Sequence, residues 1–243
     1  MNYQWITNNA FTQRYLSGEW RSPVFCDMVA KSLEGRHKPT ILDIGCGNGF
    51  DGDEKLQASL AAKAAVVLGV EPDPTVELGS FFSNVYRCPL EEAPIAPNSV
   101  DVAYCNMVLE HVAQPQLFFK KLREVLKPGG IFWGFTVDSR HLFCKFSALM
   151  ERTRIKDLYL TLLKGERGAD RYLNYPTCYR ANSPEQLEPF ARDFHSIEFI
   201  RFHRPDVLNY YLPKAFIPLS ELWNKSITPT QKPGYMLAIH LTK

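Results

Sequence analysis

The sequence predicts a doubly wound α/β fold with seven strands, a mostly parallel sheet and a cap of inserted helices. Two observations carry this prediction. A glycine-rich turn joins a short apolar strand to a helix near residue 45, and further short apolar segments then alternate with helical patterns. With 243 residues, of which 45 % are hydrophobic and 22 % charged, the chain is long enough to bury one sizeable core.

The first strand, residues 41–43, runs into a turn with three glycines at alternate positions: Gly45, Gly47 and Gly49. Glycine lets the backbone approach a ligand closely and adopt positive φ. A helix over about residues 48–65 is predicted next, so the segment is typical of a nucleotide-cofactor site. A nicotinamide site would place its third glycine where Phe50 stands, which argues against a dinucleotide enzyme.

The remaining strands and helices follow from short apolar runs and helical spacing. Six further strands are predicted at 65–70, around Val85, at 101–105, 131–136, 196–203 and 235–242. Helices are predicted before the turn at 127–130, within 142–163, and after Ser183, which would cap a helix beginning with Pro184.

Five short motifs in register resemble the class I S-adenosylmethionine (SAM)-dependent methyltransferases, most closely the branch that modifies small molecules, sugars and lipids. They are D-I-G-C-G-N-G, G-V-E, N-S-V-D-V-A, L-E-H-V and L-K-P-G-G, within about residues 40–137. The resemblance implies an antiparallel last strand and SAM as cofactor, with S-adenosylhomocysteine as product. It also implies methyl transfer to oxygen or nitrogen of a small sugar-like or natural-product acceptor.

The same resemblance implies one methyltransferase domain over residues 1–243. Its predicted parts are an N-terminal lid (1–33), a SAM-binding core (34–137), a cap leading into the sixth strand (138–194), and closing strands (195–243) with an apolar insert (204–233). The aromatic N-terminal segment is also compatible with a helix packed on the sheet edge.

The resemblance further assigns residues to the cofactor. The glycine turn would pass beneath the methionine part, Asp43 would orient its amino end, and Glu71 would bind the ribose hydroxyls. The family's usual adenine-binding aspartate falls on Pro89, so neighbouring residues would have to supply that contact. The assigned residues are Asp43, Gly45, Cys46, Gly47, Gly49, Glu71, Pro72, Leu90, Glu91, Asn106, Met107 and, from the lid, Tyr15.

Two histidines are candidate catalytic bases. Methyl transfer from a sulfonium needs a base only where the acceptor must lose a proton. His111, in L-E-H-V, and His141, after the fifth strand, both lie at the predicted carboxyl edge of the sheet, and the choice between them stays open. The six histidines lack metal-ligand spacing, so no metal is expected.

Acceptor specificity is expected in the cap. Nine basic and five acidic side chains stand between Asp138 and Arg180, which suits an acidic acceptor and equally a solvated helix face. The candidate substrate-binding residues are Asp138, Arg171, Tyr172, Tyr175, Tyr179 and Arg180. The apolar insert 204–233 could wall an acceptor pocket, form a homodimer face, touch a membrane surface, or simply pack on the core.

Composition limits partners and compartment. A net charge of +2 is too balanced to favour nucleic acid as the main substrate. We find no signal peptide in residues 1–11 and no apolar run of transmembrane length. Six cysteines without a C-x-x-C pair favour a reduced, cytoplasmic chain. The competing hypothesis is a non-catalytic SAM-binding regulatory or scaffold protein.

Overall fold

The computed structural model describes residues 3–7, 9–47, 49–153, 177–209, 212–228, 230 and 232–243. Its centre is an eight-stranded sheet in the order β1-β7-β8-β6-β5-β2-β3-β4. The strands are β1 Gln4–Ile6, β2 Thr40–Ile44, β3 Val66–Val70, β4 Asn84–Tyr86, β5 Val100–Asn106, β6 Leu126–Val137, β7 Ser196–Phe202 and β8 Met236–Thr242. Neighbours pair in parallel except at β8, which is antiparallel to both β6 and β7, as predicted for the last strand.

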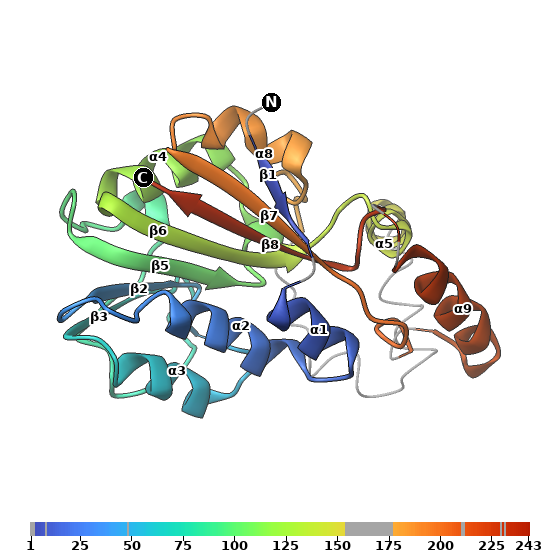
Figure 1. Cartoon of the computed structure of the whole chain (residues 1–243). Coiled ribbons are helices and arrows are strands. Elements are labelled where there is room, and N and C mark those ends of the chain that lie inside the picture. Colours follow the sequence, from blue (N-terminus) through green and yellow to red (C-terminus); the bar gives the residue numbers. More distant parts are fainter. Residues whose placement is uncertain are drawn as a thin grey trace.

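Helices cover both faces of the sheet (Figure 1). The helices α1 Ala10–Leu16, α2 Arg21–Lys31 and α3 Glu54–Ala61 lie on one face, and α4 Pro115–Val125 and α8 Pro184–Ala191 on the other. Each face has its own apolar cluster, because the central strands present buried side chains in both directions. The sheet therefore has the doubly wound form that the sequence predicts.

The cap extends beyond the carboxyl ends of the parallel strands. Helix α5 Leu142–Arg152 follows β6, and α9 Ile217–Ile227 lies between β7 and β8; both stand at the same end of the molecule in Figure 1. Three short 3₁₀ helices complete the described elements: η1 Leu90–Glu92, η2 Leu109–His111 and η3 Lys214–Phe216. No helix among the described residues is long and apolar enough to cross a bilayer.

The structure adds a strand that the sequence analysis does not predict. Strand β1 pairs in parallel with β7, and its Trp5 ring packs 5.5 Å from that of Phe199. A three-residue strand has too few positions to show a period of two, so only its pairing with β7 defines it.

The helix after the glycine turn begins later than predicted. Helix α3 starts at Glu54, because Asp53 is extended and its side chain caps the helix by accepting from the Lys55 amide. The preceding residues cannot be helical, since Gly49, Asp51 and Gly52 have φ of +44°, +56° and +82°. The turn is thus longer than its glycine spacing indicates.

Candidate cofactor and acceptor site

The glycine turn lies at the carboxyl ends of β2 and β3. The amides of Gly45 and Cys46 both donate to the Val70 carbonyl, at 2.8 and 3.2 Å, which folds the turn back over β3. A Cβ on Gly45, whose φ is +72°, would overlap Val108, and a Cβ on Gly47 would lie 2.7 Å from Glu71 Oε2. Neither glycine therefore has room for a side chain, and we call this close-packed backbone turn, residues 45–47, the cradle.

Asp43 is a buried carboxylate at the end of β2. Its Oδ2 accepts from Tyr104 Oη at 2.6 Å and from Gln57 Nε2 at 2.8 Å, and no described residue donates to Oδ1. Burial raises the pKa of Asp43 to about 6, despite the lowering effect of these two donors. The sequence does not predict either partner. The only signal for them is a polar group at an inward-facing position, Tyr104 on a strand and Gln57 on a helix.

Glu71 stands at the tip of β3 and faces the same turn. One oxygen accepts from the Gly47 amide at 2.9 Å and the other from the Asp73 amide at 3.0 Å. The next residue, Pro72, is exposed and free to contact a planar ring. Of the two residues expected near adenine, Leu90 has its side chain in the core, so only its backbone could reach a ligand, whereas Glu91 is half-buried.

Asn106 and Met107 follow β5 on the other side of the turn. Asn106 Nδ2 donates to the Gly49 carbonyl at 3.1 Å, while its buried Oδ1 has no partner among the described residues. Met107 has a φ of +57° and its amide donates to the Phe135 carbonyl at 2.8 Å. An orphaned buried oxygen that lies beside the cradle fits a polar ligand such as SAM.

The N-terminal segment is tied to the glycine turn through Asp51. Its carboxylate accepts from Arg21 Nε and Nη2 at 2.7 and 2.6 Å, from Trp20 Nε1 at 3.1 Å, and from the Ser22 hydroxyl. Arg21 and Ser22 begin α2, so the acid also lies at a helix N-terminus. Asp51 falls within the helix predicted over about residues 48–65, and no sequence pattern indicates its contact with Arg21, 30 positions away.

Tyr15, assigned to the cofactor from sequence, lies in the core. Its ring packs edge-on against Phe202 at 5.6 Å, and burial raises the pKa of its hydroxyl to about 12. The charges of Arg21 and Asp51 also influence that hydroxyl, so it lies near the ion pair that ties the N-terminal segment to the glycine turn. Its contact with a cofactor stays a prediction.

The buried thiol of Cys46 lies beneath the turn. Burial, with Asp43 and Glu71 nearby, raises its pKa far above the ordinary value. The thiol is therefore protonated and serves as a small core residue, and the expected contact of the Cys46 backbone with the cofactor stays a prediction.

The two candidate bases occupy different environments. His111 ends η2 and is half-buried, and its amide donates to the Val108 carbonyl at 2.8 Å. His141 is buried, its Nδ1 lies 3.3 Å from the Phe143 amide, and burial lowers its pKa. Asp138 is fully buried and paired with Arg140, whose Nη2 lies 2.8 Å from Oδ2.

A buried polar network at the same edge was not predicted. Glu110 accepts from the Thr136 hydroxyl at 2.8 Å, and Asn182 Nδ2 donates to that hydroxyl. Burial raises the pKa of Glu110. The Glu110 carbonyl accepts from the amides of Cys178 and Tyr179, so the end of the cap is fixed onto η2.

The structure brings some of the substrate candidates to this edge. Tyr179, with a φ of +48°, packs in the apolar cluster beside the sheet, and burial raises the pKa of its hydroxyl. Arg180 Nη1 donates to the Ala113 carbonyl at 2.7 Å. Arg171, Tyr172 and Tyr175 lie outside the described residues.

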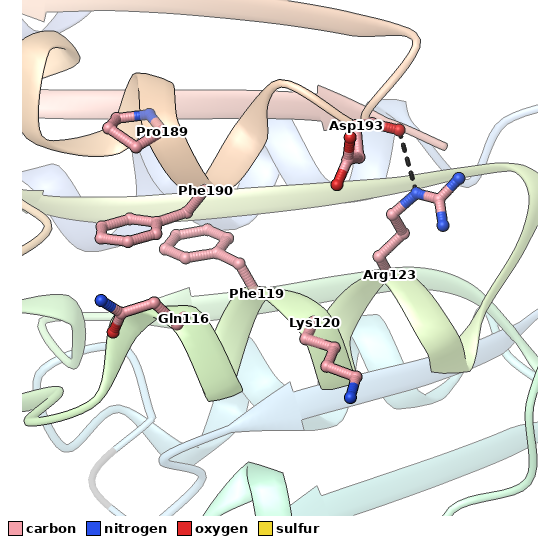
Figure 2. A pocket seen from close by; sticks show the side chains of 7 residues that line it. All are labelled: Gln116, Phe119, Lys120, Arg123, Pro189, Phe190 and Asp193. Carbon is pink, nitrogen blue, oxygen red and sulfur yellow. Dashed lines mark hydrogen bonds between the residues drawn. The ribbon is translucent and has the colours of Figure 1, made fainter.

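A separate hollow of about 220 Å³ lies between α4 and α8 (Figure 2). Phe119 and Phe190 stack at 6.1 Å on one side of it, and Arg123 donates to the Asp193 carbonyl at 2.9 Å on the other. This hollow is on an outer helical face, away from the glycine turn, and is not the cofactor site.

Comparison with known proteins gives a consistent family. A methyltransferase domain model matches residues 42–134. A ubiquinone biosynthesis O-methyltransferase from Chelativorans sp. (strain BNC1) is 31 % identical over 208 residues, covering 82 % of this chain and 69 % of the relative. A second ubiquinone biosynthesis O-methyltransferase, from Vibrio atlanticus (strain LGP32), is 30 % identical over 129 residues. That match covers 47 % of this chain and 52 % of the relative. The chain thus spans about half the length of most of these relatives.

Solved structures share the fold. A SAM-dependent methyltransferase from Archaeoglobus fulgidus superposes with a TM-score of 0.56 at 12 % identity, covering 95 % of this chain and 97 % of that one. Geranyl diphosphate C-methyltransferase from Streptomyces coelicolor A3(2), solved with S-adenosyl-L-homocysteine, superposes with a TM-score of 0.55 at 14 % identity. The match covers 90 % of this chain and 75 % of that one. Because its motifs, sheet order and relatives agree, the chain belongs to the class I SAM-dependent methyltransferases.

Proposed function

We propose that this protein transfers the methyl group of SAM to an oxygen atom of a small-molecule acceptor. The carrying observation is the paired carboxylates of Asp43 and Glu71 on either side of a glycine cradle that admits no side chain. The choice of oxygen over nitrogen rests on the relatives, which are named as O-methyltransferases. Because those relatives are named as enzymes, the non-catalytic alternative is not favoured.

The residues divide the work of holding the cofactor. Asp43 Oδ1 would receive the cationic amino group, Glu71 the ribose hydroxyls, and Asn106 Oδ1 a donor of the bound molecule. SAM supplies an electrophilic methyl group on a sulfonium. The protein then contributes alignment and exclusion of water, which for well-positioned partners corresponds to roughly 7–11 kcal/mol of barrier.

His111 is the better candidate base. A general base must reach the acceptor hydroxyl, and His111 is half-buried at the end of η2, whereas His141 is buried. Tyr179, Arg180 and Asp138 are proposed acceptor-side residues at the same edge. The acceptor's acidic or apolar character, a homodimer and the domain boundaries given above stay predictions.

We place the activity in the cytoplasm. All six cysteines are free and four are buried, which supports a reducing compartment. Protease protection after fractionation of the native cells tests this, and protein recovered from an oxidising compartment would contradict it.

Calorimetric titration with SAM and S-adenosylhomocysteine tests the cofactor site. Wild-type protein should bind both, and Glu71→Ala should weaken binding at least tenfold, or about 1.4 kcal/mol. Glu77→Ala, which removes an exposed carboxylate six positions later, is the matched control and should leave affinity unchanged. Failure of the folded wild type to bind either compound would refute the assignment.

Turnover tests the reaction and its base. With a panel of phenols, sugars and amines, we expect S-adenosylhomocysteine release only with a hydroxylated acceptor. His111→Ala should lower kcat by about 10²-fold or more without changing SAM affinity. His141→Ala is the comparison: an equal loss there with His111→Ala unaffected would reverse the assignment.

A further inference from the structure

Large apolar side chains are concentrated on the outer faces of α5 and α9. Nine such side chains are exposed among the described residues, and seven of them lie in this part of the cap, each between 41 and 66 % exposed. The cap patch consists of Leu142, Phe146 and Leu149 on α5 and of Phe216, Leu219, Leu222 and Trp223 on or next to α9. A soluble domain exposes so dense an apolar group mainly where something else covers it.

The spacing shows that each helix presents one apolar face. The α5 residues are separated by four and three positions, and those of α9 by three, three and one, so each set shares a side of its helix. The opposite side of α9 is used internally, since Asn224 and Ile227 are buried. The beginning of α5 and the second half of α9 are neighbours, because Asn224 lies beside His141.

The exposed charged side chains that the structure describes on and beside α5 and α9 at this patch are all basic. Lys145 on α5 and Lys214, Lys225 and Lys232 around α9 are exposed, whereas the described residues of 142–150 and 212–232 contain no exposed acid. Lys232 Nζ stands 5.5 Å from the Trp223 ring centroid, so an ammonium group and an indole are presented together. The one acid in α9, Glu221, is half-buried and accepts from Asn209 at 2.7 Å.

We propose that this cap patch binds an anionic lipid surface, with α9 lying along the interface. Apolar side chains surrounded by lysines fit the boundary between acyl chains and negatively charged headgroups. A symmetric contact with a second copy would place lysines opposite lysines, so the charge pattern disfavours it. Helix α9 has 11 residues, too few to span a bilayer, so it would lie within the interface.

The position of the patch relates lipid binding to the proposed active site. Helix α5 follows β6 directly through Asp138 and His141, and α9 lies at the same end of the molecule (Figure 1). A protein resting on this patch would have the acceptor edge of its sheet close to the lipid surface. Lipid binding itself requires neither SAM nor an acceptor, so it can fail or succeed independently of the proposed reaction.

Vesicle co-sedimentation of the full chain, without cofactor, tests the proposal. We expect binding to phosphatidylcholine vesicles that contain phosphatidylglycerol, little binding to pure phosphatidylcholine, and release by salt. The double variant Leu219→Ser with Leu222→Ser should bind about tenfold more weakly, and Lys225→Glu about fivefold more weakly. Leu117→Ser and Lys120→Glu, exposed substitutions of the same types on α4, are the controls and should bind as wild type.

Four results would overturn the proposal. They are no binding to either vesicle, equal loss in the α4 controls, a concentration-dependent dimer that the leucine variant abolishes without any lipid binding, and binding only to an acidic protein. Circular dichroism and urea unfolding of the leucine variant show that it is folded, and because neither measurement needs SAM, failure of this proposal is distinguished from failure of the cofactor assignment. A blue shift of emission on vesicle addition that is lost in Trp223→Phe would place the indole at the lipid.

Discussion

At the scale of single residues, the cofactor site depends on Asp43, a buried acid that is hydrogen-bonded through only one of its two carboxylate oxygens to described residues. Tyr104 and Gln57 both donate to Asp43 Oδ2, whereas no described residue donates to Oδ1. The carboxyl group has lost water without gaining a cation, and this is why its pKa rises to about 6. A cationic ligand would restore the missing charge.

This arrangement predicts a pH dependence of SAM binding. The ionised form of Asp43 attracts the amino group of SAM, which stays protonated below a pKa of roughly 8. Affinity should therefore be highest between about pH 6 and 8 and fall as the pH is lowered through about 6, where Asp43 becomes protonated. Calorimetric titrations across this range measure the effect.

The control variant is Asp43→Asn, which should bind more weakly and lose most of the pH dependence in this range. Tyr104→Phe removes one donor to the carboxylate and should move the midpoint of the profile upward. An unchanged profile in Asp43→Asn would show that another group titrates.

At the scale of elements, α2 and the glycine turn are joined by one ion pair. Arg21 and Asp51 form two short hydrogen bonds with side chains that are 17 and 22 % exposed, so solvent screens them only in part. Asp51 has positive φ, which Asn tolerates better than Ala. This ion pair, which we call the Arg21–Asp51 clamp, thus positions the N-terminal segment over the turn and maintains the turn's shape.

Loss of the clamp should lower stability. Asp51→Ala is expected to reduce the free energy of unfolding by about 1–3 kcal/mol, because Arg21 loses its partner and Ala strains the turn. Asp51→Asn should reduce the free energy of unfolding by less, because Asn tolerates the positive φ at this position. Arg21 lowers the pKa of Asp51 in the folded state. The stability gained from this shift is therefore present above the unfolded pKa near 3.9 and lost as the pH falls through the lower folded value.

Urea unfolding of Asp51→Ala, Arg21→Ala and the double variant measures the coupling between the two residues. Additive losses would mean that the ion pair contributes nothing. Deuterium exchange of α1 and α2 amides should increase selectively in Asp51→Ala if the clamp holds these helices onto the turn.

At the scale of the whole molecule, two edges are completed by segments distant in sequence. Strand β1 covers the edge of β7, where Trp5 lies 3.2 Å from the Arg201 guanidinium. At the opposite end of the strands, residues 177–182 return from the cap to the Glu110 carbonyl and to Thr136. The cofactor cradle and the acceptor edge are therefore built on one sheet but bounded by different segments.

The sequence by itself determined the alternating strands and helices, the glycine cradle and the positions of Asp43 and Glu71. These features are local: apolar periodicity, a glycine needed for positive φ at position 45, and an acid at a strand end are set by neighbouring residues. The helix cap at Ser183 is another, and its side chain accepts from the Gln186 amide as predicted.

Only the tertiary structure decided what these residues contact. Asp51 and Arg21 are separated by 30 positions, Asp43 and Tyr104 by 61, and Thr136 and Asn182 by 46. The pairing of β1 with β7 and the burial of His141 likewise depend on which elements pack together. Such contacts leave no periodic trace in the chain, because each exists only once the sheet has assembled and excluded water from both partners.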